Sequence, residues 1–122
     1  KKGRFLVRTG QYEEAISLFR KNAELEPHFK TFELLGECLL AVNRLSEAVG
    51  PLAAATTLSR GVRAPSLLAE TFLRNQKCDD AEDFARLALE RDPRNKRARD
   101  VLKNSEANKM FQSGYGKKKP DP

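Results

Sequence analysis

Apolar side chains recur at spacings of three and four residues along most of the chain, which is the period of one face of an α-helix. Glycine, asparagine or proline interrupts this pattern at intervals, and these residue types commonly end helices. The interruptions predict seven helices: a short one that ends at Thr9 and Gly10, then helices over about 12–25, 31–42, 46–58, 64–74, 79–91 and 95–110. Alternation at period two with β-branched residues never persists for six residues, so no strand is predicted.

One local pattern returns three times at a fixed spacing. Ala15, Ala48 and Ala81 are 33 residues apart, and each follows a polar stretch at the start of a predicted helix. A regular period in this range indicates stacked copies of one supersecondary unit. Arrays of that kind present an extended binding surface. The pattern therefore predicts the architecture but does not identify a ligand.

Antiparallel helix pairs at this period, with small residues at fixed points, resemble the tetratricopeptide repeat. In that family, small residues lie where the two helices of a unit touch, and here those places hold Gly3, Ala15, Gly36, Ala48, Ala55, Ala69, Ala81 and Ala88. The larger packing positions of the family hold Leu6, Phe19, Leu35, Leu39, Leu52, Leu68 and Phe72. The terminal proline of the repeat corresponds to Pro27 and Pro93, while the middle unit departs from it with Arg60.

The resemblance implies an all-α fold, a right-handed α-α superhelix (solenoid) of three helix pairs followed by a capping helix. It covers residues 1–94, and by its phasing several residues of the first helix precede Lys1. The expected division is 1–28, 29–61 and 62–94 for the repeats, 95–112 for the capping helix and 113–122 for a disordered basic tail.

The net charge of +6 is concentrated at the C-terminal end of the chain. Residues 1–90 carry 13 basic and 13 acidic side chains, whereas residues 91–122 carry 10 basic and 4 acidic ones. This asymmetry points to an acidic partner, nucleic acid or a membrane surface, and a solubilising end is the simpler explanation. No apolar run approaches the roughly 20 residues that span a bilayer. Nothing requires an oxidising compartment, so an intracellular, cytoplasmic location is expected.

Catalysis, cofactors and metal ions find little support in the sequence. The two cysteines form no CxxC pair and His28 is the single histidine, so a four-ligand zinc site is not expected. One histidine in a helical loop does not make a catalytic triad, and the glycine motifs that bind phosphates are missing from the sequence. Cys38 and Cys78 are predicted to be small buried hydrophobes. We therefore expect a non-enzymatic protein without a cofactor or a metal site.

The first helix of each unit is predicted to line a concave groove that holds a peptide or partner segment. The candidate binding residues lie on those helices and face away from the partner helix. They are Arg4, Val7, Arg8, Lys30, Glu33, Glu37, Leu40, Ala41, Arg63, Ser66, Glu70, Leu73 and Arg74. Leu40 and Leu73 would otherwise be exposed apolar groups without a task, although an ordinary solvated surface is the alternative. The expected role is that of an adaptor or scaffold in protein–protein interaction.

Groove charges indicate which peptide would fit. Glu33 and Glu37 make the middle acidic, while Arg4, Arg8 and Arg74 make the flanks basic. A peptide with apolar anchors and a basic residue near its centre would suit this arrangement, with charge setting selectivity.

Some members of the tetratricopeptide repeat family grip the C-terminal carboxylate of heat-shock chaperones with Lys, Asn and Arg side chains on the first helices. This chain departs from that pattern, because Glu33 and Glu37 occupy groove positions of the second unit. Ser66 and Leu67 lie where the arginine of the third unit would be sought. A heat-shock chaperone tail is therefore not the expected ligand.

Two alternatives stay open. The basic C-terminal run would contact phosphates of nucleic acid, although Phe111 and Tyr115 are the only aromatic residues there for base stacking. That run consists of Arg91, Arg94, Lys96, Arg97, Arg99, Lys103 and Lys117, Lys118, Lys119. The other alternative is a homo-oligomer, in which the apolar end of an incomplete first unit stacks on a second chain.

Overall fold

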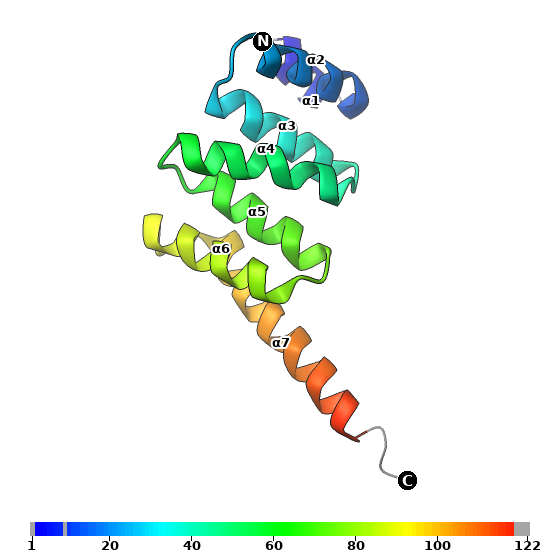
Figure 1. Ribbon diagram of the computed structural model, residues 1–122, viewed down its shortest axis with the longest axis vertical. Helices are drawn as coiled ribbons and strands as arrows, with labels where there is room; N and C mark the ends of the chain where they lie inside the picture. Colours follow the sequence, from blue (N-terminus) through cyan, green and yellow to red (C-terminus); the bar gives the residue numbers. More distant parts are fainter. Residues whose placement is uncertain (1, 9, 119–122) are drawn as a thin grey trace.

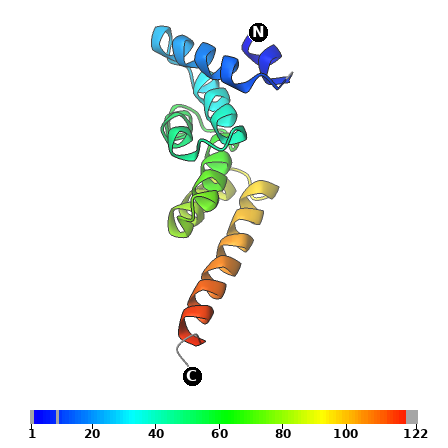
Figure 2. The same cartoon turned by 90° about the vertical axis from the view of Figure 1, so that its right-hand side faces the viewer.

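The computed structural model describes residues 2–8 and 10–118, and all regular structure within those ranges is helical. The helices are α1 (Lys2–Arg8), α2 (Tyr12–Leu25), α3 (Phe29–Ala41), α4 (Leu45–Leu58), α5 (Arg63–Arg74), α6 (Cys78–Arg91) and α7 (Lys96–Lys118). They stack as antiparallel pairs into an elongated array (Figure 1). Figure 2 shows that α7 extends beyond the stack as a long single helix. The all-helical prediction is confirmed.

The turn inside each helix pair has the same backbone geometry in all three units. Gly10, Asn43 and Gln76 have φ angles of 78°, 63° and 61°, which lie in the left-handed region. In the second unit the amide of Arg44 then donates to the carbonyl of Leu39 at 2.8 Å, and equivalent bonds close the other two turns. These are the bonds of a Schellman motif, which satisfies carbonyls at the helix end. The left-handed turns predicted at Gly10 and Asn43 are confirmed.

Small residues let the two helices of each pair approach closely, as the repeat pattern predicted. A Cβ atom added at Gly36 would lie 2.4 Å from carbon atoms of Leu52, and one added at Gly3 would lie 2.4 Å from the ring of Phe19. The alanines at the other predicted contact points are fully buried; they are Ala15, Ala48, Ala55, Ala69, Ala81 and Ala88. The close approach predicted at Gly3 and Gly36 is therefore confirmed, and the alanines at the other predicted contact points are buried.

The core changes character along the array. In the first two units it consists of large side chains such as Ile16, Phe19, Leu39 and Leu52, each of which contributes about 1.5–3 kcal/mol when fully buried. Around α5, α6 and α7 it consists mainly of alanines together with Val101. Small side chains bring α7 close to α5 and α6, and this close approach brings the polar groups of α7 within reach of α5.

Two polar contacts fix the C-terminal half of the array. Arg91, at the end of α6, donates to the backbone carbonyls of Thr56, Ser59 and Gly61 at 3.3, 3.2 and 2.9 Å, and so ties the third unit to the second. On the other side of α6, Glu82 holds the middle of α7, as described below. The cationic side chain of Arg91 therefore serves the fold.

The C-terminal end differs from the prediction. Helix α7 continues to Lys118, so residues 113–118 are helical where a tail was expected, and residues 119–122 lie outside the described part of the chain. The cause is local sequence: no proline interrupts the chain between Asn95 and Lys119, and the helix continues through Gly114 and Gly116.

Candidate functional site

Helix α5 contacts both α3 and α7, so these three helices form one continuous face, which we call the inner row. It carries most of the binding residues predicted from the sequence. Of the predicted residues on α1, Arg8 is exposed and Val7 is half-buried, while the side chain of Arg4 lies outside the described residues. The chemistry of the inner row therefore rests on α3, α5 and α7.

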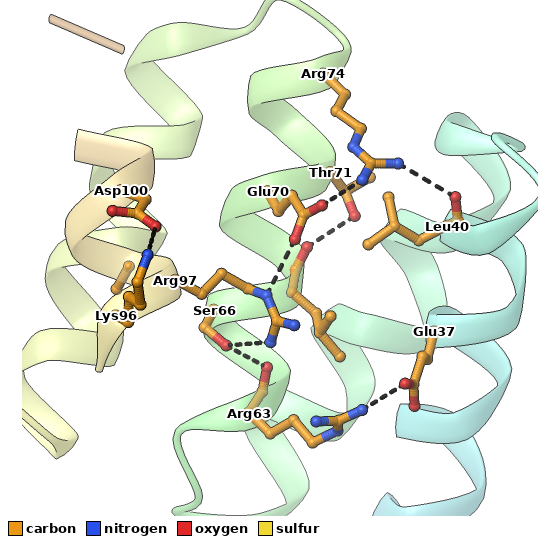
Figure 3. A network of polar contacts seen from close by, with 12 residues as sticks. Glu37, Leu40, Arg63, Ser66, Glu70, Thr71, Arg74, Lys96, Arg97 and Asp100 are labelled. Carbon is orange, nitrogen blue, oxygen red and sulfur yellow. Dashed lines mark hydrogen bonds and ion pairs between the residues drawn. The ribbon is translucent and has the colours of Figure 1, made fainter. Parts of the chain in front are cut away.

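Acidic groups on α3 are already paired with cations. Glu33 is buried, with its Oε1 atom 3.1 Å from Nζ of Lys30 and 3.7 Å from Nε of Arg63. Glu37 accepts a short hydrogen bond from Nη2 of Arg63 (Figure 3). The middle of the groove, which the sequence predicted to be acidic, is therefore internally neutralised by α5.

A second cluster joins α5 to α7 through one carboxylate. Glu70 pairs with Nη2 of Arg74 through one oxygen and with Nε of Arg97, at 3.0 Å, through the other (Figure 3). Nη1 of Arg97 also donates to the hydroxyl of Ser66 at 3.5 Å, and Nη1 of Arg74 donates to the carbonyl of Leu40 at 3.5 Å. Two arginines from different helices thus share one glutamate.

Beside this cluster, α5 and α7 line an open cavity of about 500 Å³, which falls in the range of about 300–1,000 Å³ for ligand pockets. Its lining consists of Glu70, Leu73, Asn95, Lys96, Arg97, Asp100, Val101 and Asn104. Leu73 and Val101 give it an apolar part, and two asparagines and four charged residues surround that part. We call it the α5–α7 cavity.

Asp100, at the rim of this cavity, has several cations close to it. A hydrogen bond from Lys96, at 2.9 Å, is the main reason why the pKa of Asp100 lies below its ordinary value. Burial opposes this shift, while the charges of Lys103 and Arg99 add to it. Several cations therefore act on one carboxylate at the rim.

Contacts with α6 hold α7 in place to form the cavity wall. Glu82 accepts hydrogen bonds from the Ser105 hydroxyl at 2.8 Å and from Nζ of Lys109 at 3.0 Å, and Lys109 also pairs with Asp79. Hydrogen bonds to Asp79 and Glu82 raise the pKa of Lys109 to about 12. The bonds from Lys109 and then Ser105 lower the pKa of Glu82. This network orients the face of α7 that lines the cavity.

Three of the predicted binding residues are buried: Glu33, as described above, and also Leu40 and Ser66. Leu40 is only 5% exposed, because α5 packs over α3 and includes this side chain in the core. Ser66 is fully buried and its hydroxyl donates to the carbonyl of Arg63 at 2.8 Å. The expectation that Leu40 is an exposed apolar anchor was therefore wrong, whereas Leu73 is half-buried and lines the cavity.

Six of the eight residues that line the cavity are missing from the predicted groove, because the sequence predicts only a capping role for α7. A step of 34 residues, one more than the period of 33 found in the sequence, leads from Arg63, Ser66, Leu67 and Glu70 to the lining residues Arg97, Asp100, Val101 and Asn104. In this respect α7 occupies the place of a further first helix.

Intramolecular contacts already involve part of the basic C-terminal run. Arg91 binds carbonyls of the second unit, Lys96 pairs with Asp100, and Arg97 pairs with Glu70. Three of the six cations of this run that have described side chains are therefore committed to the fold, which leaves fewer of them to contact phosphates.

Metal chemistry gains no support from the described residues, among which no group of three or more His, Cys, Asp and Glu residues could hold an ion. Cys38 is fully buried, and burial, followed by the charge of Glu37, raises the pKa of its thiol to about 11. Cys78 is partly exposed, contrary to the prediction, because it is the first residue of α6. His28 caps α3 by accepting the amide N–H of Lys30 at 3.1 Å. No helix in the described ranges is long and apolar enough to cross a membrane.

Comparisons with known proteins agree with this architecture. The family model for subunit 3 of the anaphase-promoting complex (cyclosome) matches residues 2–55, and no curated protein matches the chain. Among solved structures, the first TPR of Spaghetti (RPAP3) bound to the HSP90 peptide SRMEEVD is similar, with a TM-score of 0.83 and 21% identity over 88% of this chain and 86% of that one. The first TPR domain of human RPAP3 gives a TM-score of 0.84 and 20% identity over 93% and 91%.

A bacterial protein has the same fold. The Yersinia enterocolitica type III secretion chaperone SycD, in complex with a peptide of the translocator YopD, gives a TM-score of 0.80 and 22% identity over 88% of each chain. The sequence-based argument against a heat-shock chaperone tail finds no support here, because one of the similar domains was solved with such a peptide. Three phased helix pairs with the repeat's small contact residues, and similarity to solved repeat domains along most of the chain, lead to one conclusion: the chain has the fold of the tetratricopeptide repeat domains.

Proposed function

We propose that this chain is a non-enzymatic adaptor that binds a peptide segment of another protein along the inner row, with its main anchor in the α5–α7 cavity. The observation that carries the proposal is the cavity itself, in which the apolar side chains of Leu73 and Val101 lie beside amide and charged groups. Such a lining buries an apolar side chain while polar groups fix orientation. Asn95 and Asn104 have both donors and acceptors, so they suit the backbone of an extended peptide.

The similar structures support the same interpretation. Two of them were solved with a bound peptide, one from HSP90 and one from YopD. Because the identities are low, these peptides indicate a class of ligand and do not identify the partner of this chain. The HSP90 peptide SRMEEVD is nevertheless worth including as a direct probe, since the domain it binds shares this fold.

Two exposed positions on α7 provide a matched test. Asn104 lines the cavity, whereas Ala107 is an exposed residue on the same helix that is not among the lining residues. Asn104→Tyr should fill the cavity, and Ala107→Tyr should add the same ring almost one turn further along the helix, outside the lining of the cavity. Wild type and both variants would serve as bait in a native lysate treated with nuclease, with bound proteins identified by mass spectrometry.

We expect a partner that the wild type and Ala107→Tyr retain and Asn104→Tyr loses, while the melting temperatures of the three proteins stay close together. Partners retained equally by all three would contradict the assignment of the cavity. Bound proteins that are lost only when nuclease is present would favour the nucleic-acid alternative. The intracellular, cytoplasmic location and any self-association stay predictions from the sequence.

A further inference from the structure

Charge is unevenly distributed along the inner row. Between α3 and α5, the cations Lys30 and Arg63 are matched by the carboxylates Glu33 and Glu37, and all four take part in ion pairs. This half of the row is therefore electrically balanced, and it offers no net attraction to a charged ligand.

Between α5 and α7 the balance is lost. Five cations pair with or act on two carboxylates there, a surplus of three positive charges; the carboxylates are Glu70 and Asp100, and the cations are Lys96 and Arg97, which line the cavity, and Arg74, Arg99 and Lys103, which lie outside its lining. The hydrogen bond from Lys96 is the main cause of the lowered pKa of Asp100, and the charges of Lys103 and Arg99 lower it further. Any other carboxylate that enters the cavity would meet the same field.

Arg97 is placed to bind a ligand carboxylate. A guanidinium has five N–H donors, more than the contacts of Arg97 with Glu70 and Ser66 use. Its side chain is 37% exposed and lines the cavity, so donors are accessible from solvent. Glu70 neutralises only one of the two arginines that it contacts, which makes it an internal competitor for an incoming acid.

Resting on the function proposed above, we propose that the α5–α7 cavity selects a peptide segment in which an acidic side chain stands beside an aliphatic one. The carboxylate binds Arg97 and Lys96, and the aliphatic side chain packs on Leu73 and Val101. The sequence alone suggested the opposite, a basic ligand, because Glu33 and Glu37 were expected to be unpaired. A basic side chain would enter a region that already has surplus positive charge, and like charges in contact are unfavourable.

Simple probes test the charge preference. Four ten-residue peptides with blocked ends would be compared, each made of glycine and serine around a different central pair. The four pairs are glutamate–leucine, glutamine–leucine, lysine–leucine and glutamate–serine. Each would be titrated into the isotopically labelled full chain at low salt, with binding followed by NMR shifts of backbone amides. We expect the glutamate–leucine peptide to bind about threefold to tenfold more tightly than the glutamine–leucine peptide, to shift amides of residues 70–74 and 96–104, and to weaken as salt is added.

Removing the carboxylate of Glu70, the internal competitor, should strengthen the binding of an acidic peptide. Glu70→Gln should tighten the glutamate–leucine peptide severalfold, because Arg74 and Arg97 lose their carboxylate. Asp100→Asn should act in the same direction through Lys96. Arg97→Gln should weaken binding by a similar factor. Arg86→Gln is the matched control, since Arg86 is an exposed arginine on α6 that also pairs with carboxylates.

The outcomes separate this inference from the broader function. Tighter binding of the lysine–leucine peptide at the same amides, or weaker acidic binding in both Glu70→Gln and Asp100→Asn, would overturn the acidic preference and leave peptide binding intact. A lysate partner that is lost with Asn104→Tyr but still binds Arg97→Gln would also overturn the acidic preference and leave peptide binding intact. No shift with any peptide, together with no partner that depends on Asn104, would overturn both.

Discussion

The contact between Gly36 and Leu52 allows the packing argument to be tested quantitatively. Gly36 lies inside α3, and a Cβ atom there would be 2.4 Å from both Cδ2 and Cγ of Leu52, where ordinary contacts are at 3.4–4 Å. Leu52 is fully buried in α4, so it has no free space into which to move. The Gly36→Ala variant therefore forces the two helices of the second unit apart or forces Leu52 into a poor rotamer.

Two opposing terms set the magnitude. Overpacking of a well-packed core costs about 1–3 kcal/mol, and a clash with two carbon atoms of an immobile side chain belongs at the upper end. Alanine is favoured over glycine inside a helix by about 1 kcal/mol. The expected net result is a destabilisation of about 1–2 kcal/mol, although the same change in a typical exposed helix would stabilise.

A double-mutant cycle isolates the contact. Leu52→Ala alone should cost about 2–5 kcal/mol, and it removes the atoms that the new methyl group would meet. In that background Gly36→Ala should become stabilising by about 1 kcal/mol, so the coupling energy should be about 2–3 kcal/mol. Urea titrations followed by circular dichroism at 222 nm would measure the four free energies of unfolding. A coupling energy below about 0.5 kcal/mol would refute the reasoning, because independent sites add within that margin.

Three further outcomes are expected. Gln76→Gly should raise the free energy of unfolding by about 0.5–1 kcal/mol in the same urea assay, because Gln76 has a φ of 61° that glycine adopts without strain. Arg91→Ala should lower it by about 1.5–3 kcal/mol, because three backbone carbonyls lose a charged donor. The folded-state pKa of Glu82 lies below its ordinary 4.5, so its contribution should be complete above that pH and be lost as the pH falls through the folded value. Lys109 has a raised pKa, so its contribution to the free energy of unfolding should be complete below pH 10.5 and be lost as the pH rises to about 12. Glu82→Gln should therefore lose less stability than wild type between pH 5 and pH 3 in urea titrations (a window of roughly two pH units around the ordinary carboxyl pKa).

The helix pairs could be predicted because their determinants are local and repeated. A small residue at each contact point and a left-handed residue at two of the turns mark the units in the sequence, and the structure confirms Gly36, Gly10 and Asn43 in these roles. Gln76 escaped prediction because glutamine seldom adopts the left-handed conformation. The Schellman bonds and the packing of the third pair impose that conformation there, against the local preference.

The site could be predicted only in part, because it depends on how successive units approach one another. A helical period identifies Leu40 and Leu73 as residues that face away from the partner helix, but it does not show that α5 covers Leu40 and leaves Leu73 at the cavity. Likewise, the sequence shows Glu70 but not that an arginine 27 residues later reaches it. Ion pairs between units require the inter-unit geometry, which no single repeat contains.

Charge pairing along the inner row also limits the kind of binding that this surface supports. Because Glu70 already occupies Arg74 and Arg97, a ligand carboxylate exchanges one ion pair for another, and the net gain is smaller than that of a new pair in an empty site. Partly exposed arginines also lose much of their attraction to salt. The aliphatic contact with Leu73 and Val101 must then supply most of the affinity, while charge decides which peptides are accepted. The glutamate–serine peptide should therefore bind more weakly than the glutamine–leucine peptide.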